Sequence, residues 1–89
     1  MPERTVAIGS RQGLHARPAT LLAQAAGAAG LPVTIAKAGG SPVDAASMLL
    51  VMTLAAAKGD EVVLAADGPD ADRVLDELAA LLARDLDDE

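Results

Sequence analysis

The sequence contains no cysteine, phenylalanine, tyrosine or tryptophan, and His15 is its only histidine. The absence of cysteine excludes a disulfide framework, a thiolate nucleophile and a thiolate zinc site, and one histidine cannot build a multi-histidine metal site. The glycines match neither of the common nucleotide-binding motifs, GxGxxG and GxxxxGK[ST]. We therefore expect no metal and no cofactor, and a core made of aliphatic side chains alone.

Basic residues are also few, and the net charge is -6 at pH 7. An acidic chain without aromatic residues lacks both the basic footprint and the stacking platforms of nucleic-acid-binding proteins, so we expect no nucleic-acid partner. The charge is uneven. Residues 1–59 carry five basic and two acidic side chains, whereas residues 60–89 carry two basic and eleven acidic ones. The first two-thirds is therefore where an anion or an acidic partner should bind.

Long hydrophobic runs are missing as well. The longest apolar run, 48–57, is ten residues, whereas about 20 residues are needed to span a bilayer. The first residues lack the pattern of a secretory signal. We expect a cytoplasmic monomer without direct membrane contact. Its 89 residues predict one domain, 1–89, with no room for a two-domain enzyme and its cleft.

Hydrophobic periodicity and turn residues predict four strands and three helices. The strands are expected at 5–8, 33–37, around 42–43 and at 61–65, and the helices at 16–27, 47–54 and 70–86. The order β-α-β-β-α-β-α predicts an α+β fold, a two-layer sandwich with an open four-stranded sheet and helices on one face. The mixture of hairpin and crossover connections favours a mostly antiparallel sheet.

His15 lies in the segment 13–19, which has the sequence Gly-Leu-His-Ala-Arg-Pro-Ala and begins a predicted helix. Backbone N–H groups at a helix start lack intrahelical partners and bind anions, and the guanidinium of Arg17 can hold two phosphate oxygens. The positive helix end keeps the His15 ring neutral and nucleophilic. A nucleophilic nitrogen beside anion donors indicates a transient phosphohistidine. The alternative is a loop or cap histidine beside a solvated arginine.

This segment resembles the active-site motif of the HPr family, the histidine-containing phosphocarriers of the bacterial sugar phosphotransferase system. The similarity extends to chain length, element order and a second segment, 47–54, with the sequence Ser-Met-Leu-Leu-Val-Met-Thr-Leu. The resemblance implies an open-faced β-sandwich with three helices on one side of an antiparallel sheet. It implies that enzyme I phosphorylates His15 on Nδ1, that Arg17 stabilises the phosphate, and that enzyme II domains accept it. Such a protein is a carrier and not an enzyme.

The resemblance also implies a possible regulatory phosphorylation at Ser47, which matches a serine modified in some members. Two neighbours depart from the family pattern: Ala46 replaces a common lysine, and Leu50 replaces a common glycine. The alternative is structural. Ser47 would then be the N-cap of the short helix, its hydroxyl accepting from the N–H of Leu49 or Leu50.

The short helix at 47–54 is apolar on two faces, and a helix on one side of a sheet cannot bury both. We expect Leu50, Val51 and Leu54 to lie in the core and Met48, Leu49 and Met52 to form an exposed patch. Methionine suits a surface that must fit several partners. With the use that the family makes of this surface, the patch should bind both partners, with Thr20 and Gln24 as its polar rim. The alternative is that the chain buries all its large side chains.

Two other functions stay open. One is a regulatory binding protein of the same fold, acting on a transcription factor or a metabolic enzyme. The other is a carrier in a phosphotransfer chain that serves nitrogen or dihydroxyacetone metabolism in place of sugar uptake. The complete His-Ala-Arg-Pro segment argues against a regulatory member that lacks the histidine, but the sequence does not choose between carrier chains.

Overall fold

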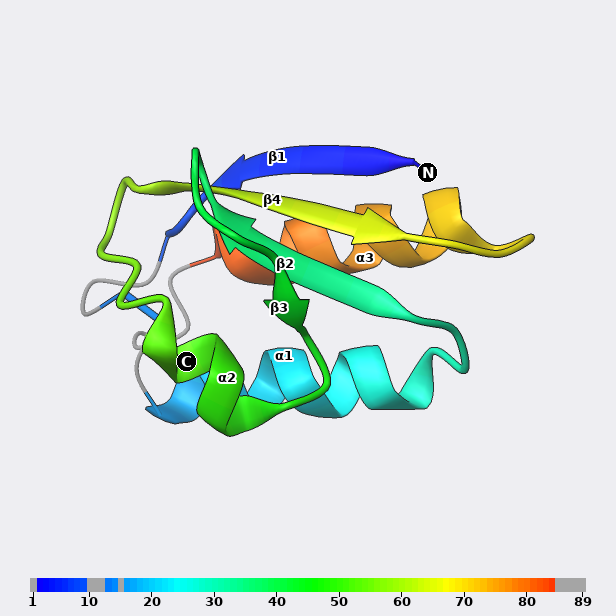
Figure 1. Ribbon diagram of the computed structural model, residues 1–89, viewed down its shortest axis with the longest axis horizontal. Coiled ribbons are helices and arrows are strands. Elements are labelled where there is room, and N and C mark those ends of the chain that lie inside the picture. The colour runs from blue at the N-terminus through cyan, green and yellow to red at the C-terminus, as the bar shows by residue number, and fades with distance from the viewer. Residues whose placement is uncertain (1, 10–12, 15, 85–89) are drawn as a thin grey trace.

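The computed structural model describes residues 2–9, 13, 14 and 16–84, and these residues form one sheet and three helices (Figure 1). The elements in chain order are β1 (Glu3–Ala7), α1 (Ala16–Ala28), β2 (Val33–Lys37), β3 (Val43–Asp44), α2 (Met48–Thr53), β4 (Glu61–Ala66) and α3 (Ala71–Ala83). The predicted order of elements is confirmed. None of the described helices is long and apolar enough to cross a membrane.

The four strands form a single sheet in the order β1-β4-β2-β3, and every neighbouring pair is antiparallel. β4 lies in the centre, with Val63 opposite Thr5 on one side and Leu64 opposite Ile35 on the other. Because β4 separates β1 from β2, the chain crosses over through α1 between these two strands. The expectation of a mostly antiparallel sheet is confirmed.

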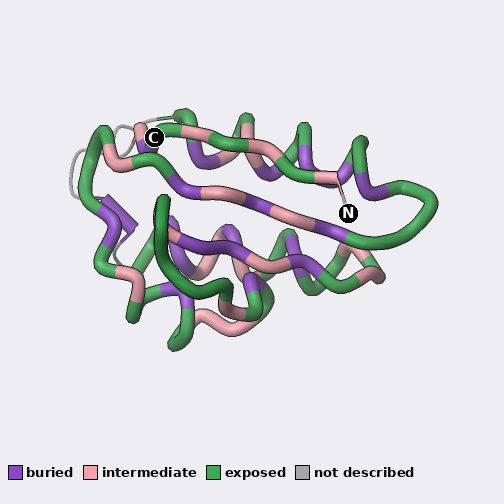
Figure 2. The backbone as a smooth tube through the Cα atoms, turned by 45° about the horizontal axis from the view of Figure 1, so that its top comes forward, coloured by how far each residue is buried: buried purple, intermediate pink, exposed green. Residues whose placement is uncertain are grey.

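The helices cover one face of the sheet and leave the other open (Figure 1). α3 packs against β1 and β4, α2 packs against β3, and α1 packs against both other helices. In β4, Val62, Leu64 and Ala66 are buried, whereas the alternate residues Val63 and Ala65 are only half-buried (Figure 2). This period of two is that of a sheet with one covered face, so the open-faced α+β sandwich is confirmed.

Aliphatic side chains alone fill the core between the sheet and the helices. The fully buried residues include Leu22 from α1, Ile35 and Leu64 from the sheet, and Leu75 and Leu82 from α3. Each such side chain contributes roughly 1.5–3 kcal/mol through its removal from water. The apolar residues that predict α3 repeat with the period of a helix and therefore lie on one face. This is the face that α3 buries.

Some predicted boundaries are wrong by one to three residues. β1 begins at Glu3, not at Thr5, because its register with β4 pairs Glu3 with Ala65. Ile8 follows the strand and is buried, with its N–H donating to the carbonyl of Asp60 at 3.0 Å. α3 begins at Ala71, and the N-cap Asp70 makes no side-chain capping bond. It ends at Ala83, because the backbone of the C-cap Arg84 is extended, so the predicted end at 86 is wrong.

Candidate functional site

The start of α1 lies beside α2, where the sequence predicts the reactive site (Figure 1). His15 itself lies outside the described residues, so the site is built here from its neighbours. The N–H of Leu14 donates to the carbonyl of Ala56 at 2.8 Å, and the Leu14 side chain is only 4% exposed. Ala16 and Arg17, the next described residues, are exposed. The described residues that flank position 15 are therefore a core anchor on one side and an exposed helix start on the other.

Gly13 allows this anchor to form. Its φ of 75° lies in the left-handed region, which glycine adopts without steric cost. A Cβ at this position would collide with the carbonyl oxygen of Ala56 and would lie 2.8 Å from the Cα of Ala57. Only glycine therefore lets the segment before α1 lie directly against the backbone that follows α2.

The carboxylate of Asp60 stabilises the segment that contains Ala56. Asp60 Oδ2 accepts a hydrogen bond from the N–H of Ala57 at 3.0 Å and lies 3.6 Å from Nζ of Lys37. The N–H, and to a lesser degree the Lys37 charge, favour the ionised form and lower the pKa of Asp60 below its ordinary value. The turn at 57–60 thus has its own support. It in turn positions Ala56, to which Leu14 binds.

The first turn of α1 is the place where the sequence predicts an anion to bind. It contains no acidic residue, so no carboxylate of its own neutralises the positive helix end. Arg17 is exposed at the second position of the helix, while Pro18 and Ala19 are buried beneath it. Pro18 is tolerated there because an N–H in the first turn has no intrahelical acceptor. The turn therefore directs its charge outward and its apolar residues inward.

Thr20 links this helix to α2. Its single hydroxyl proton has two acceptors within reach, the carbonyl oxygen of Ala16 at 2.7 Å and Sδ of Met48 at 3.1 Å. Gln24, one turn further along α1, is exposed. The predicted polar rim thus divides into Thr20, which contacts the short helix, and Gln24, which faces solvent.

The outer face of α2 is apolar and exposed. Leu49 is 76% exposed, Leu50 42% and Met52 37%, and these three residues are called the α2 patch below. Val51 is fully buried, while Met48 and Leu54 are half-buried and pack against the core. Two expectations are therefore wrong: Leu50 lies outside the core, and Met48 lies at the inner edge of the patch. Met48, Val51 and Leu54 are spaced three residues apart, so they share the face that meets α1 and the sheet.

Ser47 is the N-cap of α2, as the structural interpretation predicted. It has an extended backbone, and its hydroxyl accepts from the N–H of Leu50 at 3.4 Å. The side chain is half-buried. A role for Ser47 in regulation stays a prediction.

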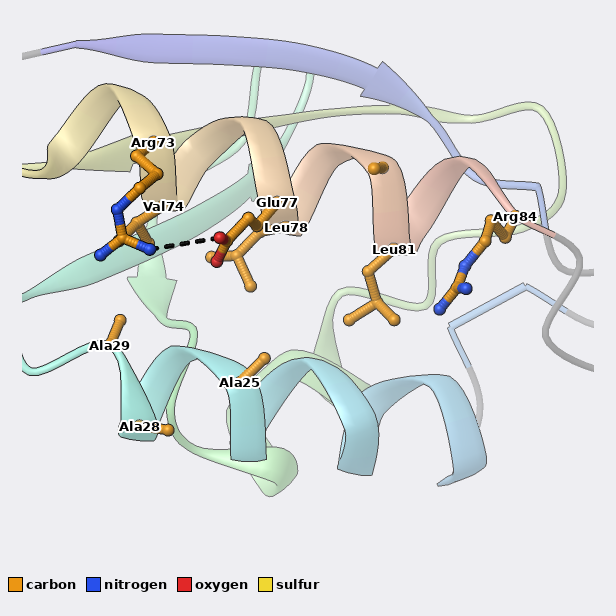
Figure 3. A pocket seen from close by; sticks show the side chains of 10 residues that line it. Ala25, Ala28, Ala29, Arg73, Val74, Glu77, Leu78, Leu81 and Arg84 are labelled. Atoms are coloured by element: carbon orange, nitrogen blue, oxygen red, sulfur yellow. Dashed lines mark hydrogen bonds and ion pairs between the residues drawn. The ribbon is translucent and has the colours of Figure 1, made fainter.

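A groove of about 600 Å³ lies elsewhere, between the last turn of α1 and the length of α3 (Figure 3). Alanines of α1 form one wall, Leu78 and Leu81 of α3 form the other, and Arg73 at one end is paired with Glu77 at 3.2 Å. None of the predicted site residues lines this groove. No cluster of three or more potential metal ligands occurs within the described part of the chain.

Known proteins resemble this chain throughout its length. The family model described as "PTS HPr component phosphorylation site" matches residues 2–84. The chain belongs to the HPr family. The phosphocarrier protein HPr of Streptomyces coelicolor is 54% identical over 88 residues, which cover 99% of this chain and 95% of the relative. The phosphocarrier protein NPr of Shewanella violacea is 38% identical, covering 97% of this chain and 93% of the relative.

Solved structures agree with these relatives. The crystal structure of an HPr phosphocarrier from Bacillus anthracis superposes with a TM-score of 0.85 at 33% identity, covering 91% of this chain and 95% of that one. The resemblance inferred from the segments at 13–19 and 47–54 is confirmed. This HPr-family chain is a phosphocarrier of the phosphotransferase system, a carrier of phosphoryl groups and not a catalyst.

Sequence reasoning missed three features of the site: the exposure of Leu50, the close approach of Gly13 to Ala56, and the support from Asp60. For the close approach to Ala56, the only signal in the sequence was the glycine of the motif, Gly13. Nothing in the sequence pairs Ala56 with Leu14, because the two residues are 42 positions apart and neither has a distinctive side chain.

Proposed function

We propose that His15 accepts a phosphoryl group from phosphorylated enzyme I and that enzyme II domains of sugar uptake then remove it. The observation that supports this proposal is the setting of the described residues around position 15. Leu14 before it is anchored in the core, and α1 after it begins with exposed residues and has no acidic side chain in its first turn.

The chemistry requires a neutral ring with a free Nδ1 lone pair. That nitrogen attacks phosphorus, an N–P bond forms, and the bond between phosphorus and the donor breaks with its electrons returning to the donor. The ring keeps its proton on Nε2. Arg17 and the amides of the first turn of α1 are the groups that would balance the negative charge of the phosphoryl oxygens. Transfer to the acceptor reverses these steps.

Both partners must reach the same nitrogen, so both must cover the start of α1. The α2 patch is the adjacent apolar surface, and Thr20 joins the two helices beside it. We assign docking of enzyme I and of enzyme II domains to Leu49, Met52 and Leu50, with Met48 at the inner edge and Thr20 and Gln24 as the polar rim. A cytoplasmic monomer would expose this surface to both partners in turn.

The sugar chain is favoured over the other phosphotransfer chains because the HPr relative is 54% identical and the NPr relative 38% identical. A purely regulatory binding protein would need neither the exposed Arg17 nor a first helical turn without acidic residues. At Ser47, the capping bond to Leu50 already accounts for the hydroxyl.

The test is incubation with phosphoenolpyruvate and enzyme I, followed by mass spectrometry before and after acid treatment. We expect one acid-labile phosphoryl group in the wild type, located at His15. His15→Gln, which keeps a polar side chain of similar size, should take up none and should melt at the temperature of the wild type. Labelling of His15→Gln would contradict the assignment. No labelling of the wild type would favour the regulatory binding protein.

A further inference from the structure

The α2 patch contains a thioether at a position where its chemistry matters. Met52 is 37% exposed on the outer face of α2, and Met48 precedes it by one helical turn. The sequence has three methionines, the third being Met1, and it has no cysteine, tryptophan or tyrosine. Methionine sulfur is therefore the principal target that this protein offers to a peroxide.

We propose that Met52 is a redox-sensitive modification site, and that its oxidation to the sulfoxide by a peroxide switches off docking of the phosphoryl donor. The sulfur takes the terminal peroxide oxygen. An S–O bond forms as the O–O bond breaks, the sulfur is oxidised by two electrons, and the peroxide leaves as water or an alcohol. This inference rests on the proposed function, because it names a form of regulation of the same surface.

The sulfoxide opposes docking through its polarity. The thioether is a weak acceptor that loses little when an apolar partner covers it, whereas the sulfoxide oxygen is a strong acceptor that water satisfies in the free protein. Contact with an apolar partner surface would remove that water and leave the oxygen without a donor. Leu49 and Leu50 flank Met52 and supply no donor from their side chains, so the patch itself cannot compensate.

Met48 should respond differently, although it lies on the same helix. Its side chain is half-buried against the core, and its Sδ lies 3.1 Å from the Thr20 hydroxyl, whose one proton it shares with the carbonyl oxygen of Ala16. A hydrogen bond to the sulfur reduces the electron density available for attack, and burial restricts the approach of the oxidant. We expect Met52 to oxidise several-fold faster than Met48. Replacing Thr20 with the isosteric valine should accelerate oxidation of Met48 and leave the rate at Met52 unchanged.

The fold should tolerate the oxidised Met52. The contact of α2 with the core is made by the fully buried Val51, with Met48 and Leu54 beside it, and not by the outer face. A single oxygen on an exposed side chain removes no core contact. The loss of docking should therefore occur in a protein with an unchanged melting temperature.

The experiment uses the full chain treated with hydrogen peroxide, after which catalase removes the oxidant before enzyme I and phosphoenolpyruvate are added. Peptide mass spectrometry assigns the sulfoxides, and initial rates over a range of carrier concentrations give kcat and KM for enzyme I. We expect oxidation of Met52 to raise KM about tenfold or more, with kcat little changed, as for a loss of ground-state binding. A methionine sulfoxide reductase with a thiol reductant should restore KM.

Variants identify the responsible sulfur, each being compared with its own untreated sample. Met48→Leu should lose affinity on oxidation as the wild type does, whereas Met52→Leu should not. A matched control places a methionine on the exposed face of α3, as Ala80→Met in the Met48→Leu/Met52→Leu background. This methionine should oxidise without effect on KM.

Three outcomes would overturn the inference. The first is an oxidised wild type with an unchanged KM, and the second is an equal loss in oxidised Met52→Leu. The third is unfolding of the oxidised protein at the assay temperature, which would place the effect in the fold. If the untreated wild type is labelled at His15 but oxidation has no effect, only the redox inference fails. If the untreated protein is not labelled at all, the proposed function fails and the inference fails with it.

Discussion

The backbone of Leu14 is bonded to that of Ala56, with the Leu14 N–H 2.8 Å from the Ala56 carbonyl oxygen. This single contact ties Leu14 to the segment after α2, so the residues that precede α1 and the α2 patch share one support. Asp60 extends the support by accepting from Ala57. Displacements on either side of this contact should therefore affect phosphoryl transfer without any change in the reactive groups.

Gly13→Ala tests that support directly. The added Cβ would collide with the Ala56 carbonyl, and φ would stay in a region unfavourable to alanine. We expect a loss of more than about 1 kcal/mol in the free energy of unfolding and a clear decrease in the phosphorylation rate. Denaturant unfolding and the enzyme I assay measure the two effects.

Gly30→Ala is the matched control for this change. Gly30 has nearly the same φ, 77° against 75°, but a Cβ added to it would have no atom within 4 Å beyond the adjacent residues of the chain. Gly30→Ala should therefore be destabilised only because alanine disfavours the left-handed φ, and its rate of phosphoryl transfer should stay at the wild-type value. Equal effects of the two substitutions on transfer would show that the contact with Ala56 is unimportant.

Ala55→Gly should stabilise the protein. Ala55 follows the C-cap of α2 with a φ of 53°, the one left-handed non-glycine backbone among the described residues. Glycine is favoured at this position because it has no Cβ to oppose the left-handed conformation. We expect a gain of roughly 0.5–1 kcal/mol in the free energy of unfolding. Ala57→Gly, whose φ is not left-handed, should lose stability; a loss in both variants would contradict the interpretation.

Arg17→Lys tests how the phosphoryl charge is stabilised. Lysine keeps the charge but loses the planar fork that holds two oxygens, so kcat for transfer should decrease by about tenfold or more while KM changes less. Stopped-flow or quench measurements with enzyme I separate the two constants. Arg73→Lys on α3 is the control and should behave as the wild type. A lysine that supports wild-type transfer would exclude a two-oxygen role for Arg17.

The charges of α3 should not contribute to docking. Asp76 is bonded to Arg4 Nε at 3.0 Å and Glu77 to Arg73 at 3.2 Å, so both carboxylates serve contacts within the fold. In Asp76→Asn/Glu77→Gln, transfer at physiological salt should be nearly unchanged, because screening weakens exposed charges beyond a Debye length of about 8 Å. The melting temperature should decrease only slightly, since Arg4 keeps Asp72 as a partner. A severalfold change in KM would place α3 at the interface.

Local patterns predicted much of this protein because they act over a few residues. The stripe from Val74 to Leu82 specifies a helix and its buried face together, and the alternation in β4 specifies one covered side. The segment at 13–19 has a local pattern of residue types, so the position of Arg17 in the first turn of a helix was predictable without coordinates. The capping role of Ser47 is local in the same way.

Tertiary structure decided what depends on distant neighbours. α2 has only six residues and is apolar nearly all round, so its sequence could not say which side would be buried; contact with α1 turned Met48 inward and left Leu50 exposed. The bond between Leu14 and Ala56 likewise joins two backbones that carry no side-chain signal. The sequence by itself determined the order of the elements and the motif of the family, whereas packing between distant segments determined which surfaces surround the start of α1.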